Sequence, residues 1–121
     1  MMLTYDNLLS EAFNKVPQFR AEYKELMRED VLDADSGNHT IFGYAFTPML
    51  INAIKNEDKA TVKNMMDFLE DMASSSDNKV VEVCDYSVLE ALNDEIEENI
   101  ISSLIGEDTR IGYLEIKKYM E

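Results

Sequence analysis

The sequence contains a single cysteine, Cys84, and this scarcity excludes two kinds of covalent or metal stabilisation. No internal disulfide can form, and no cage of thiolates can hold a metal. Because Cys84 lies in an apolar run, we predict that it is a small buried residue without a chemical role. Glycine is also scarce, and the four glycines are scattered too widely to form a phosphate-binding loop.

Long apolar runs are absent as well. The chain has no stretch of about 18 apolar residues that could span a bilayer. Its first residues, MMLTYDNLLSEAFNK, lack the basic-then-apolar layout of a signal peptide. We therefore expect a cytoplasmic protein that does not contact a membrane.

Positive charge is in short supply. Lys and Arg number 11 against 25 Asp and Glu, so the formal net charge is −14 and the sequence pI is near 4.3. Binding to phosphate groups depends on basic patches and on the release of counterions. The charge balance therefore argues against nucleic acid and anionic membrane as ligands.

The acidic excess is concentrated between residues 67 and 98. This stretch has eleven acidic residues and one base, Lys79, whereas the other 89 residues have 14 acidic and 10 basic ones. A chain that needed only solubility would scatter its surplus charge, because concentrated like charge repels itself. The eleven acidic residues are Asp67, Glu70, Asp71, Asp77, Glu82, Asp85, Glu90, Asp94, Glu95, Glu97 and Glu98.

The composition predicts a folded globule. A chain of 121 residues with 45% hydrophobic and 30% charged residues suits one domain, which we place at residues 1–121. Apolar residues recur at spacings of three and four, and the alternation typical of strands is missing. We predict an all-α fold: an irregular helical bundle of about six or seven helices, or a stack of helical hairpins resembling HEAT units.

Three helical regions are predicted in the first half of the chain. The first covers about residues 5–15 and ends at Pro17, which also suits the start of the second, at about residues 18–28. Turn residues in DADSGNHT separate the second region from IFGYAFTPMLINAIKN. This third region is either kinked at Pro48 or restarted there, with Thr47 as its N-cap.

The second half predicts four more helices, whose ends carry capping signals. Ser76 or Asp77 can cap the helix expected at about residues 78–93, and Gly106 suits the position that follows the helix expected at about residues 95–105. The four helices are expected at about residues 59–73, 78–93, 95–105 and 109–120.

Acidic residues fall on helix faces away from the apolar stripes. In residues 59–73 the stripe is Val62, Met65, Met66, Leu69, Met72 and Ala73. In residues 78–93 it is Val80, Val83, Cys84, Ser87, Val88, Ala91 and Leu92, which leaves outward Glu82, Asp85, Tyr86, Glu90 and Asn93. Two neighbouring antiparallel helices would then display acidic outer faces. A tyrosine among carboxylates, Tyr86, is the pattern of a hot spot for a basic partner.

Catalytic and metal-binding patterns are missing. A carboxylate-bridged di-iron site needs a Glu-x-x-His from each of two helices, but the only histidine is His39, in a predicted turn. DADSGNHTIFGY begins like a calcium loop, but its first glycine stands at the fifth position instead of the sixth, and Tyr44 replaces the required final Glu. No Ser, His and acid grouping is suggested by spacing. We expect a protein that is not an enzyme and needs no cofactor or metal.

A resemblance supports a binding role. FLEDMASSSDNKVVEVCDYSVLEALND, followed by LIGEDTR, resembles small all-helical bacterial proteins, some of which are immunity proteins of contact-dependent inhibition or polymorphic toxin systems. The similarity covers about the C-terminal half and consists of the hydrophobic spacing with the FLE and VLE pieces. It implies that the chain binds one cognate toxin domain and neutralises it.

The leading hypothesis is thus an acidic immunity protein for a basic, nuclease-type toxin, since enzymes that cut nucleic acid are basic around their clefts. The alternative is a non-catalytic helical adaptor that binds another protein or associates with itself. The residues predicted to contact the partner are Glu70, Asp71, Glu82, Asp85, Tyr86, Glu90, Asp94, Glu97 and Glu98.

Overall fold

The computed structural model describes residues 2–120, and within that range every regular element is a helix. The helices that follow one another without a break join into seven helical segments of one irregular bundle, which confirms the predicted all-α fold. Their bounds are α1 Leu8–Lys15, α2 Pro17–Arg28, α3 Asn38–Ile41, η1 Phe42–Phe46, α4 Thr47–Lys55, α5 Lys59–Ala73, α6 Asn78–Glu82, η2 Val83–Leu89, α7 Glu90–Glu95, α8 Glu98–Leu104 and α9 Glu107–Met120.

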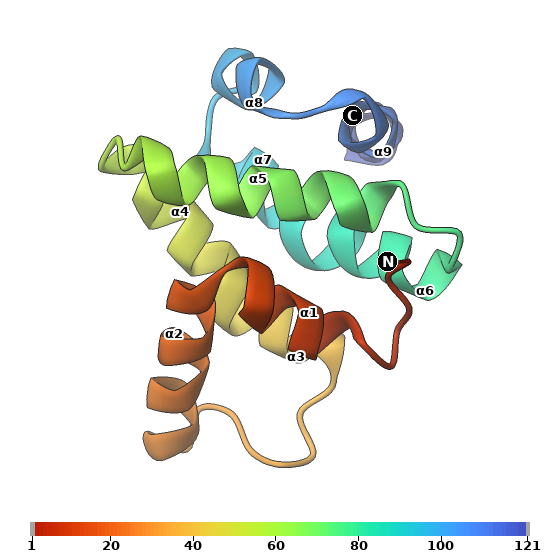
Figure 1. Cartoon of the computed structure of the whole chain (residues 1–121). Coiled ribbons are helices and arrows are strands. Elements are labelled where there is room, and N and C mark those ends of the chain that lie inside the picture. The colour runs from red at the N-terminus through yellow and green to blue at the C-terminus, as the bar shows by residue number, and fades with distance from the viewer. Residues whose placement is uncertain (1, 121) are drawn as a thin grey trace.

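The long helix α5 is the centre of the arrangement. In Figure 1 it crosses the middle of the molecule, with α8 and α9 above it and α1 and α2 below it. Both faces of α5 are therefore used for packing. This explains why Phe68, which lies outside the predicted apolar stripe, is buried together with Met65 and Leu69.

A π-helical turn resolves the question at Pro48. The backbone remains helical from α3 through η1 into α4, and Phe46 and Thr47 both have right-handed helical angles. The restart with Thr47 as N-cap is therefore wrong. A proline ring crowds the carbonyl four residues earlier and offers no N–H, and the wider turn of η1 accommodates both effects. The Thr47 hydroxyl donates to two carbonyl oxygens that share its proton, that of Phe42 at 2.9 Å and that of Ser87 at 2.8 Å.

A second π-helical segment, η2, interrupts the helix predicted at residues 78–93. Its wider turn changes which residues face inward. Leu89, which the regular helical spacing leaves off the predicted stripe, is completely buried beside Val88. Cys84 is buried as predicted, and burial, with the Asp85 and Glu70 carboxylates nearby, raises its thiol pKa.

The N-terminal half of the core is an aromatic cluster. The ring of Phe46 lies 5.1 Å from Phe42, 5.3 Å from Phe19 in an edge-to-face arrangement, and 6.4 Å from Phe68. All four side chains are almost fully buried. The cluster joins α2, η1 and α5, so it ties the first half of the chain to the central helix.

Several predicted ends of helices are corrected. The first helix begins at Leu8 rather than at residue 5, and His39 lies inside α3 rather than in a turn. Ile96 and Ile105 have extended backbone, so α8 is shorter than the predicted helix at 95–105. Gly106 does not adopt the left-handed conformation expected of it. Asp77 accepts a hydrogen bond from the Lys79 N–H, which confirms the predicted cap of α6.

Removing the central ring of the aromatic cluster should weaken the fold severely. We expect Phe46→Ala to lower the free energy of unfolding by about 3–5 kcal/mol, because it leaves a cavity between Phe19, Phe42 and Phe68. Tyr44→Ala is the matched control: Tyr44 stands in the same helical segment but is 63% exposed. Chemical denaturation followed by circular dichroism measures both, and equal losses would contradict the role of the cluster.

Candidate functional site

The acidic segment is partly covered by the C-terminal helix. α9 packs across α5 and η2, and the first turn of α9 meets the side chain of Glu70. The Glu70 carboxylate accepts hydrogen bonds from the Thr109 N–H at 3.0 Å, the Thr109 hydroxyl at 2.8 Å and the Asp108 N–H at 3.1 Å. Glu70 is therefore the N-terminal cap of α9, supplied from another helix.

A glycine makes room for this cap. A Cβ atom on Gly106 would lie 2.5 Å from Oε1 of Glu70, so a larger residue would displace the carboxylate. Partial burial by itself would raise the pKa of Glu70, but the hydrogen bonds from Thr109 and Asp108 outweigh it and lower the pKa overall. The ionised carboxylate is the form that caps the helix, which also interacts favourably with the positive end of the α9 dipole.

A second carboxylate, Asp85, lies beneath the middle of α9. A Cβ atom on Gly112 would stand 2.4 Å from its Oδ1, and within residues 2–120 this buried oxygen has no hydrogen-bond donor. Burial, and secondarily the nearby carboxylate of Glu115, raises the pKa of Asp85 to about 6. Unlike Glu70, Asp85 is therefore a source of instability when it is ionised.

These contacts correct the predicted outer face. Asp85 and Asn93 were expected to point to solvent, but α9 covers both: the Tyr113 hydroxyl donates to Oδ1 of Asn93 at 2.7 Å. The Glu70 carboxylate likewise accepts hydrogen bonds from the first turn of α9 and is not free to bind a partner. The local helical pattern does not show which neighbour will cover a polar face, and the only sequence signals for Glu70 and Asp85 were the glycines opposite them, Gly106 and Gly112.

Other predicted residues remain on the surface. Glu82, Tyr86, Glu90 and Asp94 recur every four residues along α6, η2 and α7, about one turn apart, and we call them the acidic strip. Tyr86 is 55% exposed, Glu82 and Asp94 are exposed, and Glu90 is half-buried. Asp71 on α5 and Glu97 before α8 are exposed too.

Ion pairs separate the acidic residues into two groups. Asp67 pairs with Lys63 at 2.8 Å, Glu95 with Lys55 at 3.3 Å, and Glu98 with Lys117. In the part of the chain that the structure describes, no basic side chain pairs with the acidic residues of the strip or with Asp71 and Glu97.

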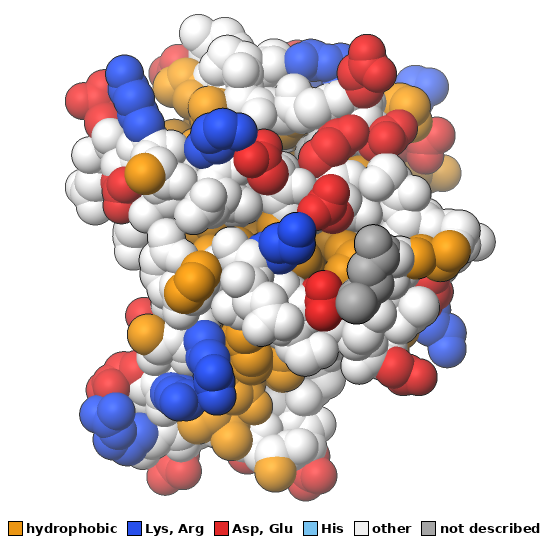
Figure 2. Space-filling view, in the orientation of Figure 1, with side chains coloured by type: hydrophobic (Ala, Val, Ile, Leu, Met, Phe, Trp, Pro, Cys, Tyr) orange, Lys and Arg blue, Asp and Glu red, His pale blue; other side chains and the backbone are white. Residues whose placement is uncertain are grey.

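The visible face in Figure 2 shows a further segregation of charge. Asp and Glu side chains gather over α5 and α9, and Lys and Arg side chains gather at the lower left over α2. On this face the charge is therefore unevenly distributed, although acidic side chains also lie among the basic ones over α2.

The structure also brings together one pair that spacing did not suggest. Nδ1 of His39 lies 2.7 Å from Oγ of Ser87, which ties α3 to η2. Among residues 2–120 no carboxylate bonds to the imidazole ring, so the third member of a catalytic triad is missing. No three His, Cys, Asp or Glu side chains of these residues are grouped as metal ligands, and Asp33 and Asp35 form a local turn.

These features define a small, acidic, all-helical protein with a largely unpaired acidic surface. Within residues 2–120 no helix combines the length and apolar character needed to cross a bilayer. A family model described as "Domain of unknown function (DUF7674)" matches residues 9–121, and the chain belongs to this family. No curated protein and no solved structure matches the chain.

The role of Glu70 as a cap predicts a large difference between two adjacent carboxylates. We expect Glu70→Ala to lower the free energy of unfolding by about 2 kcal/mol, because three hydrogen bonds to a charged acceptor are lost. Asp71→Ala removes the same charge from an exposed position and should change stability by less than about 0.5 kcal/mol. Thermal unfolding of both variants tests this, and equal melting temperatures would exclude the capping role.

The partly buried carboxylate of Asp85 predicts that replacing it with a neutral side chain will stabilise the protein, by an amount that depends on pH. Its pKa rises from the usual 3.8 to about 6, so the folded state binds this proton more tightly and loses stability as pH increases through that window. Asp85→Asn should therefore stabilise the protein at pH 7 by about 1 kcal/mol, a value reduced for partial exposure. The gain should shrink towards pH 4, where the wild-type carboxyl group is largely protonated.

Glu82→Gln provides the control for Asp85→Asn, because Glu82 is exposed and carries the same charge. Denaturant titrations at pH 7 and pH 4 measure both variants against the wild type. A gain for Asp85→Asn that is independent of pH, or equal to that of Glu82→Gln, would contradict the burial of an unsatisfied carboxylate.

Proposed function

We propose that this protein neutralises a basic toxin domain by binding it through the acidic strip, to whose negative potential the exposed carboxylates of Asp71 and Glu97 add. The observation that carries the proposal is the set of exposed carboxylates that form no ion pair within residues 2–120. A carboxylate without a structural partner adds self-repulsion and returns no stability to the fold.

The chemistry of the strip suits a basic protein surface. Glu82, Glu90 and Asp94 supply negative potential, and Tyr86 supplies a large exposed ring with a polar tip. Tyrosine at the centre of an interface provides much of the binding energy, and surrounding charges increase the rate of encounter. A nuclease-type toxin meets this requirement, because a cleft that binds polyphosphate is basic.

The role of a neutraliser explains why fast encounter would be useful. Complementary charge raises association rates to about 10⁸–10⁹ M⁻¹s⁻¹ at low salt, compared with about 10⁵–10⁶ M⁻¹s⁻¹ for neutral surfaces. A toxin captured at such rates has little time to reach its substrate. The resemblance to immunity proteins in residues 68–94 and 104–110 points the same way.

A second candidate is a helical adaptor that associates with itself. Ile111 and Leu114 on α9 are 62% and 51% exposed, and Tyr119 near the end of the same helix is 86% exposed. Apolar side chains along one helix are the usual means of self-association. Analytical ultracentrifugation over a range of concentrations tests this candidate, which predicts an average mass that rises with protein concentration.

The first experiment is affinity capture of the tagged protein from its own cells at low salt, with mass spectrometry of the proteins eluted by increasing salt. We expect one basic partner whose isolated domain kills cells unless this protein is co-expressed. Capture of a partner without toxic activity would support the adaptor. Capture of several unrelated basic proteins would indicate that the acidic strip is only a solvated surface.

Charge reversal then tests the surface itself. The double variant Glu82→Lys, Glu90→Lys should slow association with the captured partner about ten-fold at low salt and flatten its salt dependence. The matched control is Glu22→Lys, Glu29→Lys, which changes the net charge equally on or beside the distant helix α2. Stopped-flow kinetics measures both, and equal slowing would show that only the net charge matters.

A further inference from the structure

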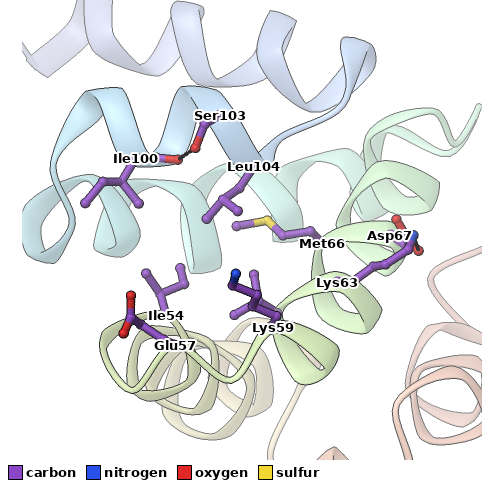
Figure 3. A pocket seen from close by; sticks show the side chains of 10 residues that line it. Ile54, Glu57, Lys59, Lys63, Met66, Asp67, Ile100, Ser103 and Leu104 are labelled. Carbon is purple, nitrogen blue, oxygen red and sulfur yellow. Dashed lines mark hydrogen bonds and ion pairs between the residues drawn. The ribbon is translucent and has the colours of Figure 1, made fainter.

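A pocket of about 390 Å³ opens between α8 and the junction of α4 and α5. Its wall consists mainly of apolar side chains from three helices: Ile54, Val62, Met66, Ile100 and Leu104. Figure 3 shows these helices surrounding the space, with Leu104 and Met66 facing Ile54 across it. The volume lies within the range of small-molecule sites, which are typically apolar with a few polar groups.

Four charged residues line the same pocket, and they are not equivalent. Lys63 is paired with Asp67 at 2.8 Å along α5, so these two charges neutralise each other. In Figure 3 the Lys63 ammonium is turned towards Asp67, and the Glu57 carboxylate lies at the outer edge beside Ile54. Neither group is directed into the centre of the pocket.

Lys59 differs from these neighbours. Its ammonium group points into the pocket between Ile54 and Leu104 in Figure 3. Within residues 2–120 no carboxylate lies within ion-pair distance of it. Most basic side chains of the described residues form no ion pair, so the feature that distinguishes Lys59 is the position of its ammonium group above an apolar wall.

We propose that this pocket binds a small amphipathic anion, with its hydrocarbon part against Met66, Ile100 and Leu104 and its carboxylate or sulfonate group on the Lys59 ammonium. Hydrocarbon burial supplies the affinity, and the charge complementarity of Lys59 supplies the selectivity for an anion. This site is separate from the acidic strip, so it does not depend on the function proposed above.

Three ligands of equal chain length test the proposal by isothermal titration calorimetry: octanoate, octanol and octylammonium. We expect saturable one-to-one binding of octanoate, weaker binding of octanol and still weaker binding of octylammonium. Lys59→Gln should weaken octanoate binding about five-fold and leave octanol unchanged, because only the anion contacts the ammonium group. Lys24→Gln, an exposed lysine on α2, is the matched control and should change neither.

A filling variant tests the apolar wall. Ile100→Trp, at a residue that is 40% exposed, should abolish the binding of both octanoate and octanol by occupying the pocket. Thermal unfolding establishes that the variant folds. Independently of any variant, octanoate should shift the NMR signals of the methyl groups of Met66, Ile54 and Leu104 in the wild-type protein.

Four results would overturn the proposal. They are the absence of saturable octanoate binding, binding of octylammonium as tight as that of octanoate, an unchanged octanoate affinity in Lys59→Gln, and methyl shifts confined to other parts of the molecule. A wild-type dimer that Ile100→Trp converts to a monomer would also overturn it, because the pocket would then hold a second copy of this chain.

Discussion

The contact between Glu70 and the first turn of α9 determines the shape of the acidic half of the molecule. Three hydrogen bonds converge on one carboxylate, and Gly106 allows the backbone to come close enough for them to form. Without this cap, α9 would begin with unsatisfied N–H groups above a segment of strongly like charge. The negative charge of Glu70 thus assists folding, because it faces the positive end of a helix dipole.

The same helix also limits the repulsion within the segment that it covers. Residues 107–120 contain three acidic and three basic side chains, and one of the basic ones, Lys117, pairs with Glu98. Exposed pairs of this kind contribute little to stability individually, so their effect is mainly to lower the local density of charge. α9 consequently covers or pairs part of the acidic segment, and it leaves the acidic strip available.

Local periodicity was sufficient to predict the helices but not their neighbours. The stripe in α5 from Val62 to Met72 is buried as expected, because a helix that packs on a core must present such a stripe. The burial of Leu89 could not be predicted from a regular spacing, because η2 widens the turn. The covering of Glu70 and Asp85 depends on α9, some 30 residues further on, and their only sequence signals were the two glycines opposite them. The pocket beside Lys59 required three helices to be placed together.

Stability explains some carboxylates of the acidic segment and leaves others unexplained. Glu70 caps a helix, Asp77 caps another, and Asp67, Glu95 and Glu98 have basic partners, so each of these has a structural reason to be acidic. Glu82, Glu90, Asp94 and Glu97 have none among residues 2–120, and each adds to the repulsion within one segment. Solubility alone would be satisfied by the same charges scattered over the remaining surface. The recurrence of Glu82, Glu90 and Asp94 along the helix face of Tyr86 is therefore better explained by binding than by folding. For this reason the proposed interface is centred on Tyr86 rather than on the net charge of the chain.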